Sequence, residues 1–231
     1  MDNSISSCME AYRILGHANA ALSIIIDSLY SRYGENFRVE IISNIDAKSN
    51  EYANLDYILD DIRIEEFHYK SWTPSVMSHF ILGGMSPRTK RIIYEMFLRE
   101  FQIKAPMYAS VCHAQIILGN GVDFGYGCNF SPGVTVAPYT NIGNFVTLNR
   151  HVSIGHHTQI EDFCTINPGA NIAGICFIRE GAQIGMGANV LDRVEIGANA
   201  IVGAGSLVTK NVPRGTVVYG VPARVVREKE Q

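Results

Sequence analysis

Large apolar residues recur at every sixth position along the C-terminal half of the chain. Counting in sixes from Leu118 to Val208 meets only apolar side chains, and no insertion interrupts the series. It runs through Leu118, Phe124, Phe130, Val136, Ile142, Leu148, Ile154, Ile160, Ile166, Ile172, Ile178, Ile184, Val190, Ile196, Val202 and Val208. Neither a helix nor an alternating strand has a period of six. A hexapeptide repeat does, and it predicts a parallel β-helix.

A second, weaker pattern accompanies the first. The residue four positions after most of the large ones is small or β-branched, as at Cys128, Ala170 and Ala188. We expect the large side chains to fill a three-sided prism and the small ones to fit beside its corners. Asn and Gly, as in Asn141–Gly143 and Gly203–Gly205, suggest corners that need positive φ. Three hexads would form one coil, and coils would stack about 4.8 Å apart through parallel hydrogen bonds.

The first hundred residues have a different pattern, in which strand-like and helix-like segments alternate. Ser86 and Pro87 suit the N-cap and first turn of the second helix. The order strand, helix, strand, strand, helix predicts a small α/β domain with a parallel sheet. Residues 50–72 indicate no element clearly, and residues 106–115 are expected to form a hinge. The expected strands are Tyr12–Gly16, Arg38–Ser43 and His79–Leu82, and the expected helices are His17–Tyr33 and Pro87–Phe101.

Polar or glycine-containing loops follow each of the three expected strands. They are Gly16-His17, Asn44–Asp46 and Gly83-Gly84. In a parallel sheet the carboxyl ends of the strands form the ligand-binding edge, so these loops are candidates for a binding site. Glycines after strands also commonly form simple turns, and that alternative remains open.

Composition excludes some classes of function. The 231 residues carry a formal net charge of −3 with Lys and Arg scattered, which argues against nucleic acid as the main partner. The longest apolar runs, such as Ile24–Ile26, are too short for membrane insertion. Met1–Glu10 lacks the features of a signal peptide, so we expect a cytoplasmic protein. The five cysteines have no metal-binding spacing.

Three of the seven histidines fall close together, at His151, His156 and His157. Because His156 and His157 follow Ile154-Gly155, we expect both at a corner and on the outer side of the solenoid. An imidazole titrates near neutral pH and suits proton transfer. A solvated surface histidine is the alternative, and for His157 it is the interpretation we favour from sequence.

Several motifs of the solenoid together resemble one family, the hexapeptide-repeat sugar acetyltransferases. This family includes sialic acid O-acetyltransferases and the N-acetyltransferases of bacillosamine-type and perosamine-type amino sugars. The resemblance rests on residues 149–156 and on Ile166-Asn167-Pro168-Gly169-Ala170, Ile172-Ala173-Gly174, Ile184-Gly185-Met186-Gly187-Ala188, Val202-Gly203-Ala204-Gly205-Ser206 and Tyr219-Gly220-Val221-Pro222-Ala223. It is strong from residue 116 onward and looser before it.

The resemblance implies an α/β Rossmann-like domain over residues 1–110 and an all-β left-handed parallel β-helix over residues 111–231. The hand comes from the resemblance alone, because right-handed crossovers are otherwise favoured. It also implies a homotrimer with active sites between neighbouring β-helices, acetyl-CoA as cosubstrate and no metal. The implied acceptor is the amino group of a nucleotide-linked amino sugar, a precursor of surface glycans.

Roles for particular residues follow from the same resemblance. His156 matches the general base, Asn149 a hydrogen-bonding residue near it, and the Gly174 amide can stabilise an oxyanion. The amine would attack the thioester directly, without an acyl-enzyme. Acetyl-CoA would be held near Gly174, Met186, Gly187 and Ala204. The nucleotide sugar would be held near Gly16, His17, Asn44, Asp46, Lys48 and Gly83.

The chain also departs from the family pattern. Many relatives flank the histidine with carboxylates that orient it, whereas Gly155 and His157 flank His156 here. Glu161 or Asp162 could substitute for them. Relatives often place a second histidine nine residues further on, where this chain has Thr165.

Other functions remain open at this point. One is O-acetylation of a sugar hydroxyl, as in sialic acid, and another is a non-catalytic scaffold. A third is a zinc site like that of the γ-class carbonic anhydrases, with His151 and His156 as two ligands. Its third histidine would fall at Gln115, and His113 misses that position by two residues.

Overall fold

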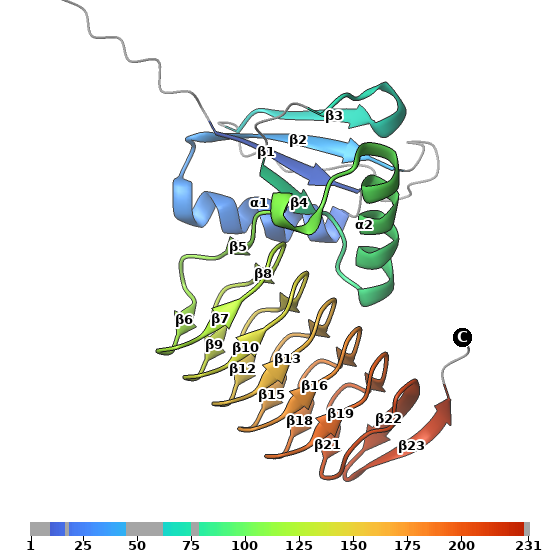
Figure 1. The fold of residues 1–231 in the computed structure, drawn as a ribbon. Helices are drawn as coiled ribbons and strands as arrows, with labels where there is room; N and C mark the ends of the chain where they lie inside the picture. Colours follow the sequence, from blue (N-terminus) through green and yellow to red (C-terminus); the bar gives the residue numbers. More distant parts are fainter. Residues whose placement is uncertain (1–9, 17–18, 45–61, 75–78, 229–231) are drawn as a thin grey trace, which may run out of the picture.

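The computed structural model describes residues 10–16, 19–44, 62–74 and 79–228. A small α/β unit lies over the first coils of a long solenoid (Figure 1). The elements of the α/β unit are β1 (Glu10–Leu15), α1 (Asn19–Tyr33), β2 (Phe37–Ser43), β3 (Ile64–His68), the 3₁₀ turn η2 (Tyr69–Ser71), β4 (His79–Leu82), α2 (Pro87–Phe101) and the 3₁₀ turn η3 (Ala105–Met107).

The ends of both helices follow local sequence signals. Ser86 Oγ accepts a hydrogen bond from the Thr89 N–H at 3.1 Å, and Pro87 occupies the first turn of α2. Gly34, with φ of +61°, follows α1 and donates its N–H to Tyr30 O at 2.9 Å. The sequence contains both signals, and the helices end at Tyr33 and Phe101 as it predicts.

The sequence did not predict β3 or η2, which lie within residues 50–72, where no element was clear. β3 is the edge strand next to β2. Its residues Glu65 and Glu66 break the alternation of polar and apolar residues, because neither face of this edge strand is fully buried.

The sheet has the order β3-β2-β1-β4, with all strands parallel. The chain moves outward from β1 to β3 and then returns to the other side of β1 to form β4. Gly16 and Gly83 directly follow β1 and β4, which are neighbours in the sheet. The Gly83 N–H donates to Leu15 O at 2.8 Å, and a Cβ on Gly83 would lie 2.5 Å from Gly16 O. Only glycine allows this close approach.

From Val111 the chain winds into three parallel sheets, each built from every third strand. The Gln159 sheet contains β7 (Asp123–Phe124), β10 (Asn141–Ile142), β13 (Gln159–Ile160), β16 (Phe177–Ile178) and β19 (Glu195–Ile196). The Asn171 sheet contains β6 (Ile117–Leu118), β9 (Thr135–Val136), β12 (Ser153–Ile154), β15 (Asn171–Ile172), β18 (Asn189–Val190) and β21 (Leu207–Val208). The docking sheet contains β5 (Val111–Cys112), β8 (Asn129–Phe130), β11 (Thr147–Leu148), β14 (Thr165–Ile166), β17 (Gln183–Ile184), β20 (Ile201–Val202), β22 (Thr216–Gly220) and the antiparallel β23 (Ala223–Glu228).

The coils stack in strict register, as the six-residue period predicts. Ile142 pairs with Ile160, eighteen residues on, and the same step relates strands on every face. The large apolar series is buried except at Leu118 and Phe124, which lie in the first coils at the open end. The hexapeptide β-helix predicted from sequence is confirmed.

The corners only partly follow the glycine and asparagine pattern. Gly187 and Gly205 have positive φ as expected, but neither Asn141 nor Gly143 does. That corner places Phe145 in the left-handed region instead, with φ of +56°. A non-glycine residue there costs on the order of 1–2 kcal/mol, so another interaction must offset the strain.

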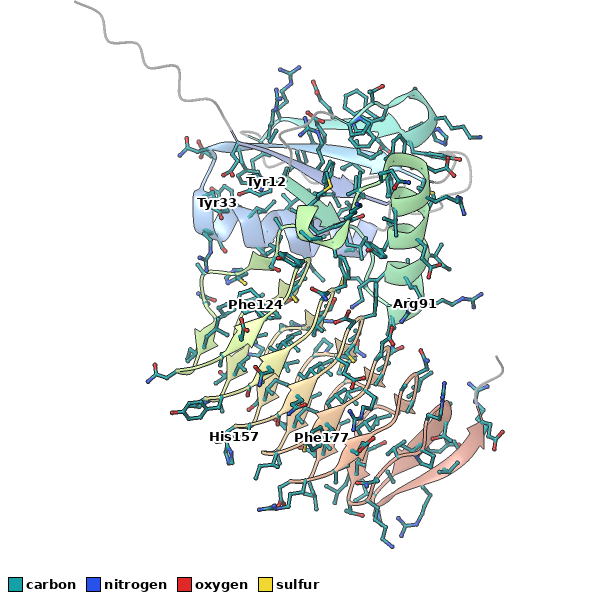
Figure 2. The ribbon with its side chains drawn as sticks, in the orientation of Figure 1. Tyr12, Tyr33, Arg91, Phe124, His157 and Phe177 are labelled. Atoms are coloured by element: carbon teal, nitrogen blue, oxygen red, sulfur yellow. The ribbon has the colours of Figure 1, made fainter. Side chains whose placement is uncertain are left out.

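Aromatic packing against α2 supplies that interaction. The Tyr94 ring lies 4.8 Å from the Phe145 ring and 5.8 Å from that of Phe163, another corner residue with positive φ. Arg91 lies on α2 (Figure 2). Its guanidinium covers the Phe163 ring at 4.5 Å and forms an ion pair with Glu180 at 2.6 Å. These contacts fix the small domain onto the docking sheet.

A buried lysine lies at the centre of this interface. Lys90 is 2% exposed, and its Nζ donates to Phe145 O at 2.6 Å, Cys164 O at 2.9 Å and Thr147 Oγ1 at 3.1 Å. Three acceptors match the three donors of an ammonium. Burial nevertheless lowers the pKa of Lys90 to about 7, because the ammonium loses its hydration.

This lysine should make stability depend on pH. Between pH 7 and 10.5 the unfolded chain holds a proton on Lys90 that the folded chain has released, so folding becomes more favourable as pH rises. The slope is about 1.4 kcal/mol per pH unit. In Lys90→Met the slope disappears. Urea unfolding from pH 6 to 9 should show the wild type gaining stability relative to this variant above pH 7. The exposed Lys104→Met serves as control, and an equal pH response in both variants would contradict the assignment.

The contact between Gly16 and Gly83 gives a second prediction. Gly83→Ala forces β1 and β4 apart and should lower the free energy of unfolding by about 1–3 kcal/mol. At the neighbouring Gly84 an added Cβ would lie 3.2 Å from its nearest neighbour, which small shifts can absorb. Thermal unfolding should therefore rank Gly83→Ala below Gly84→Ala, and the reverse order would refute the close-approach argument.

Candidate functional site

Turns of the solenoid stack into three ridges that position the candidate residues. The histidine corner comprises residues 138–139, 156–157, 174–175 and 192–193. The glycine corner comprises residues 132–133, 150–151, 168–169, 186–187 and 204–205. The helix corner comprises residues 144–145, 162–163 and 180–181. Residues eighteen apart lie directly above one another on the same corner.

His156 lies beside Gly174, one coil along on the histidine corner. A side chain added to Gly174 would begin 2.8 Å from His156 Nε2, so the imidazole lies against the Gly174 backbone. Within the described residues the Gly174 N–H has no backbone partner. At the helix corner, by contrast, side chains take such N–H groups, as Asp162 Oδ1 does for Asn144 N at 2.7 Å. An exposed imidazole nitrogen and a free amide donor thus lie side by side.

The residue that contacts His156 is His157. Their Nδ1 atoms lie 3.0 Å apart, and both rings are exposed. Sequence alone favoured a solvated His157. The adjacency of the two histidines was the signal that could have suggested the contact. The carboxylates considered in its place lie elsewhere, because Glu161 and Asp162 are on or next to the helix corner, a third of a coil away.

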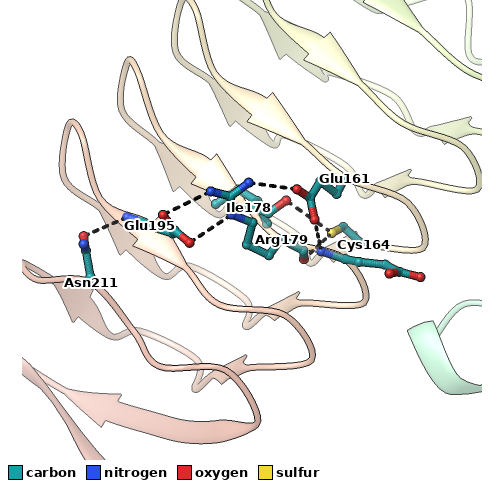
Figure 3. A network of polar contacts seen from close by, with 7 residues as sticks. Glu161, Cys164, Ile178, Arg179, Glu195 and Asn211 are labelled. Carbon is teal, nitrogen blue, oxygen red and sulfur yellow. Dashed lines mark hydrogen bonds and ion pairs between the residues drawn. The ribbon is translucent and has the colours of Figure 1, made fainter.

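Those carboxylates hold the solenoid together instead (Figure 3). Arg179 donates to Glu161 Oε1 and to Glu195 Oε1, each at 2.9 Å, and so links three successive strands of the Gln159 sheet. Asn211 Oδ1 accepts from the Glu195 N–H at 2.9 Å. The hydrogen bond from Arg179 lowers the pKa of Glu195. This ladder is a structural element and does not contact His156.

Asn149 lies at a different corner from His156. It is 5% exposed and lines a cleft of about 290 Å³ between α1 and the glycine corner. The cleft is also lined by Asp27, Ser131 and Arg150. Asn149 and His156 lie near opposite edges of the Asn171 sheet, so one chain does not bring them together.

The residues expected to hold acetyl-CoA are divided in the same way. Met186, Gly187 and Ala204 lie on the glycine corner, whereas Gly174 lies on the histidine corner. Met186 is 57% exposed, and nothing lies within 4 Å of a Cβ added to Gly187. The glycine corner is therefore open to a ligand.

Three of the six residues expected to hold the nucleotide sugar lie together. Gly16, Asn44 and Gly83 follow the neighbouring strands β1, β2 and β4 at one edge of the sheet. The gap between β1 and β4 is also where the strand order reverses, the usual place for a ligand in such sheets. Sequence alone could not show this reversal. The other three residues, His17, Asp46 and Lys48, lie outside the described residues.

The described cysteines are poor nucleophiles. Burial raises the pKa of both Cys128 and Cys164 to about 12, so their thiols stay protonated.

His151, considered as a zinc ligand, lies on the glycine corner while His156 lies on the histidine corner. Among the described residues no group of three or more His, Cys, Asp or Glu side chains is placed to hold a metal ion. In the same residues no helix combines the length and apolar character needed to span a bilayer.

Comparisons with known proteins agree with this architecture. The family model described as bacterial transferase hexapeptide (six repeats) matches residues 175–210. No curated protein matches the chain in sequence. Solved structures match along almost its whole length, at identities that show the fold alone.

Three of these structures are informative. WeeI from Acinetobacter baumannii is 21% identical, with a TM-score of 0.73, over 94% of this chain and 100% of its own. The acetyltransferase domain of PglB from Neisseria gonorrhoeae, solved with acetyl coenzyme A, is 19% identical, with a TM-score of 0.76, over 94% and 99%. PerB from Caulobacter crescentus, solved with CoA and GDP-perosamine, is 21% identical, with a TM-score of 0.74, over 96% and 99%. The chain therefore has the fold expected from its sequence, a parallel α/β domain followed by a left-handed β-helix of hexapeptide repeats.

Proposed function

We propose that the protein transfers the acetyl group of acetyl-CoA to the amino group of a nucleotide-linked amino sugar, a precursor of surface glycans. The observation that carries this proposal is the arrangement of His156 Nε2 beside Gly174, whose N–H has no backbone partner within the described residues. It supplies a proton acceptor and an oxyanion donor at one point. The proposal is supported by a fold shared with structures that contain acetyl-CoA, or CoA and GDP-perosamine.

The chemistry requires one bond to form and one to break. The neutral amine attacks the thioester carbonyl, and the Gly174 N–H stabilises the oxygen as it becomes negative. His156 Nε2 accepts the proton that the amine loses. The carbon–sulfur bond then breaks, and the same proton passes to the departing thiolate, which gives the amide and CoA. The protonated thiols of Cys128 and Cys164 support direct attack without an acyl-enzyme.

The two parts of the chain would bind different substrates. Residues 1–110 would hold the nucleotide at the carboxyl edge of the sheet, through Gly16, Asn44 and Gly83 together with His17, Asp46 and Lys48. Residues 111–231 would hold acetyl-CoA along the solenoid, with Gly174, Met186, Gly187 and Ala204 in contact with it. The reversal of strand order at Gly16 and Gly83 supports the first assignment.

A complete site would need more than one copy of the chain. Asn149 and the open glycine corner lie near one edge of the Asn171 sheet, and His156 lies at the other. We propose a homotrimer in which the glycine corner of one protomer faces the histidine corner of the next. The cytoplasm remains the expected compartment.

The function is tested by CoA release from acetyl-CoA in the presence of UDP-, dTDP- and GDP-linked amino sugars. A thiol reagent reports turnover, and hydroxylamine treatment of the product separates a stable amide from a labile ester. An amide product supports the proposal. An ester product would favour the alternative, O-acetylation of a sugar hydroxyl, and no release with any acceptor would refute both.

His156→Ala should remove the base and leave binding intact. We expect kcat to fall by about 10²–10⁴-fold, the usual contribution of a general base. Thermal stabilisation by acetyl-CoA should be unchanged. Turnover close to that of the wild type would exclude His156 as the base.

Asn44→Ala should change KM, whereas His156→Ala should change kcat. Because Asn44 lies at the sheet edge and far along the chain from the solenoid corners, its loss should raise KM for the nucleotide sugar with little change in kcat. The KM for acetyl-CoA is the internal control. An unchanged KM for the sugar nucleotide would place the nucleotide elsewhere.

A further inference from the structure

The contact between His156 and His157 determines where the His156 proton lies. Their Nδ1 atoms are 3.0 Å apart, and the two rings are perpendicular, with an interplanar angle of 87°. Two imidazole nitrogens at this distance share one proton, so one ring donates and the other accepts. Figure 2 shows His157 projecting outward from the edge of the solenoid.

Only one of the two arrangements makes His156 a base. If His156 donates from Nδ1, its Nε2 keeps a lone pair and can accept a proton. If His157 donates, the neutral His156 ring carries its proton on Nε2 and cannot act as a base. The proposed role of His156 as the base therefore requires the first arrangement, in which Nε2 carries no proton.

We infer that His157 is a positioning residue, whose neutral Nδ1 accepts the His156 Nδ1–H and keeps Nε2 of His156 free to act as the base. The inference rests on the proposed function. It also assigns a role to the residue found where a carboxylate was expected.

The surroundings of His157 hold its ring in place. The His157 N–H donates to Pro138 O at 3.1 Å, and φ of +56° turns the side chain back along the corner. The Tyr139 ring, one coil below, lies 5.1 Å from the His157 ring at an interplanar angle of 39°. The imidazole is thus confined between a tyrosine and the base.

The charges near His157 are few. One coil above, Gly174 and Ile175 are uncharged, and two coils above, Asp192 and Arg193 lie 3.7 Å from each other. Within the described residues no carboxylate forms a hydrogen bond or an ion pair with either histidine. The acceptor for His156 is therefore an uncharged imidazole.

Two substitutions at His157 separate its hydrogen bond from its bulk. Asparagine places Oδ1 near the position of Nδ1, accepts the same bond at every pH and tolerates positive φ. Alanine removes the acceptor. His79→Asn is the control, because His79 is an exposed histidine of the small α/β unit at the amino end of β4, opposite the carboxyl edge expected to hold the nucleotide.

The expected kinetic results are distinct for the three variants. His157→Ala should lower kcat by about 10- to 100-fold, a part of the 10²–10⁴ that a general base contributes, with KM for acetyl-CoA unchanged. His157→Asn should keep kcat within about threefold of the wild type, because the hydrogen-bond acceptor is retained. His79→Asn should leave the rate as in the wild type.

A spectroscopic measurement tests the pairing without relying on turnover. Nitrogen-15 NMR of labelled histidines should show His156 protonated on Nδ1 in the wild type and in His157→Asn. In His157→Ala the His156 proton should be shared between Nδ1 and Nε2. A wild type that releases no CoA would end the proposed function, and the NMR result would still decide the pairing.

Three results would overturn the inference. The first is a wild-type rate in His157→Ala. The second is a loss in His157→Asn as large as in His157→Ala, which would mean that bulk matters and the acceptor does not. The third is a His156 ring protonated on Nε2 in the wild type.

Discussion

Parallel hydrogen bonding between residues eighteen apart is the constraint on which the rest of the molecule depends. Each coil must close in three hexads, because an extra residue would move every later large side chain away from the interior. The same register places Gly174 directly over His156. Coil closure alone therefore brings these two groups of the candidate site together, and no further element is needed to position them.

Coil closure also requires left-handed backbone conformations, and different residue types adopt them at different corners. At the glycine corner Gly187 and Gly205 adopt positive φ at little cost. Phe145 and Phe163 adopt it with large side chains, which then project from the solenoid and pack against Tyr94 of α2. Two strained positions of the helix corner thus hold the small domain.

The sequence predicted the solenoid well because the repeat is local, and the large apolar residue of each hexad marks one strand. The period also predicted that Gly174 stacks on His156, since the two residues differ by one coil of eighteen residues. It could not predict which face the small domain covers, because that depends on Lys90, and a lysine within an amphipathic helix normally indicates an exposed position. The contact of His157 depends on a left-handed backbone at a residue type that rarely adopts it. β3 was missed because an edge strand need not alternate.

The antiparallel strand β23 has a consequence for the far end of the solenoid. A stack of parallel coils ends in unpaired backbone groups, to which another solenoid could add and so form a fibre. β23 runs against β22, so the docking sheet ends on a strand of opposite direction that cannot continue the parallel stack. Arg224, Arg227 and Glu228 add charge along this last edge. At this end, a second solenoid therefore cannot extend the docking sheet by parallel pairing.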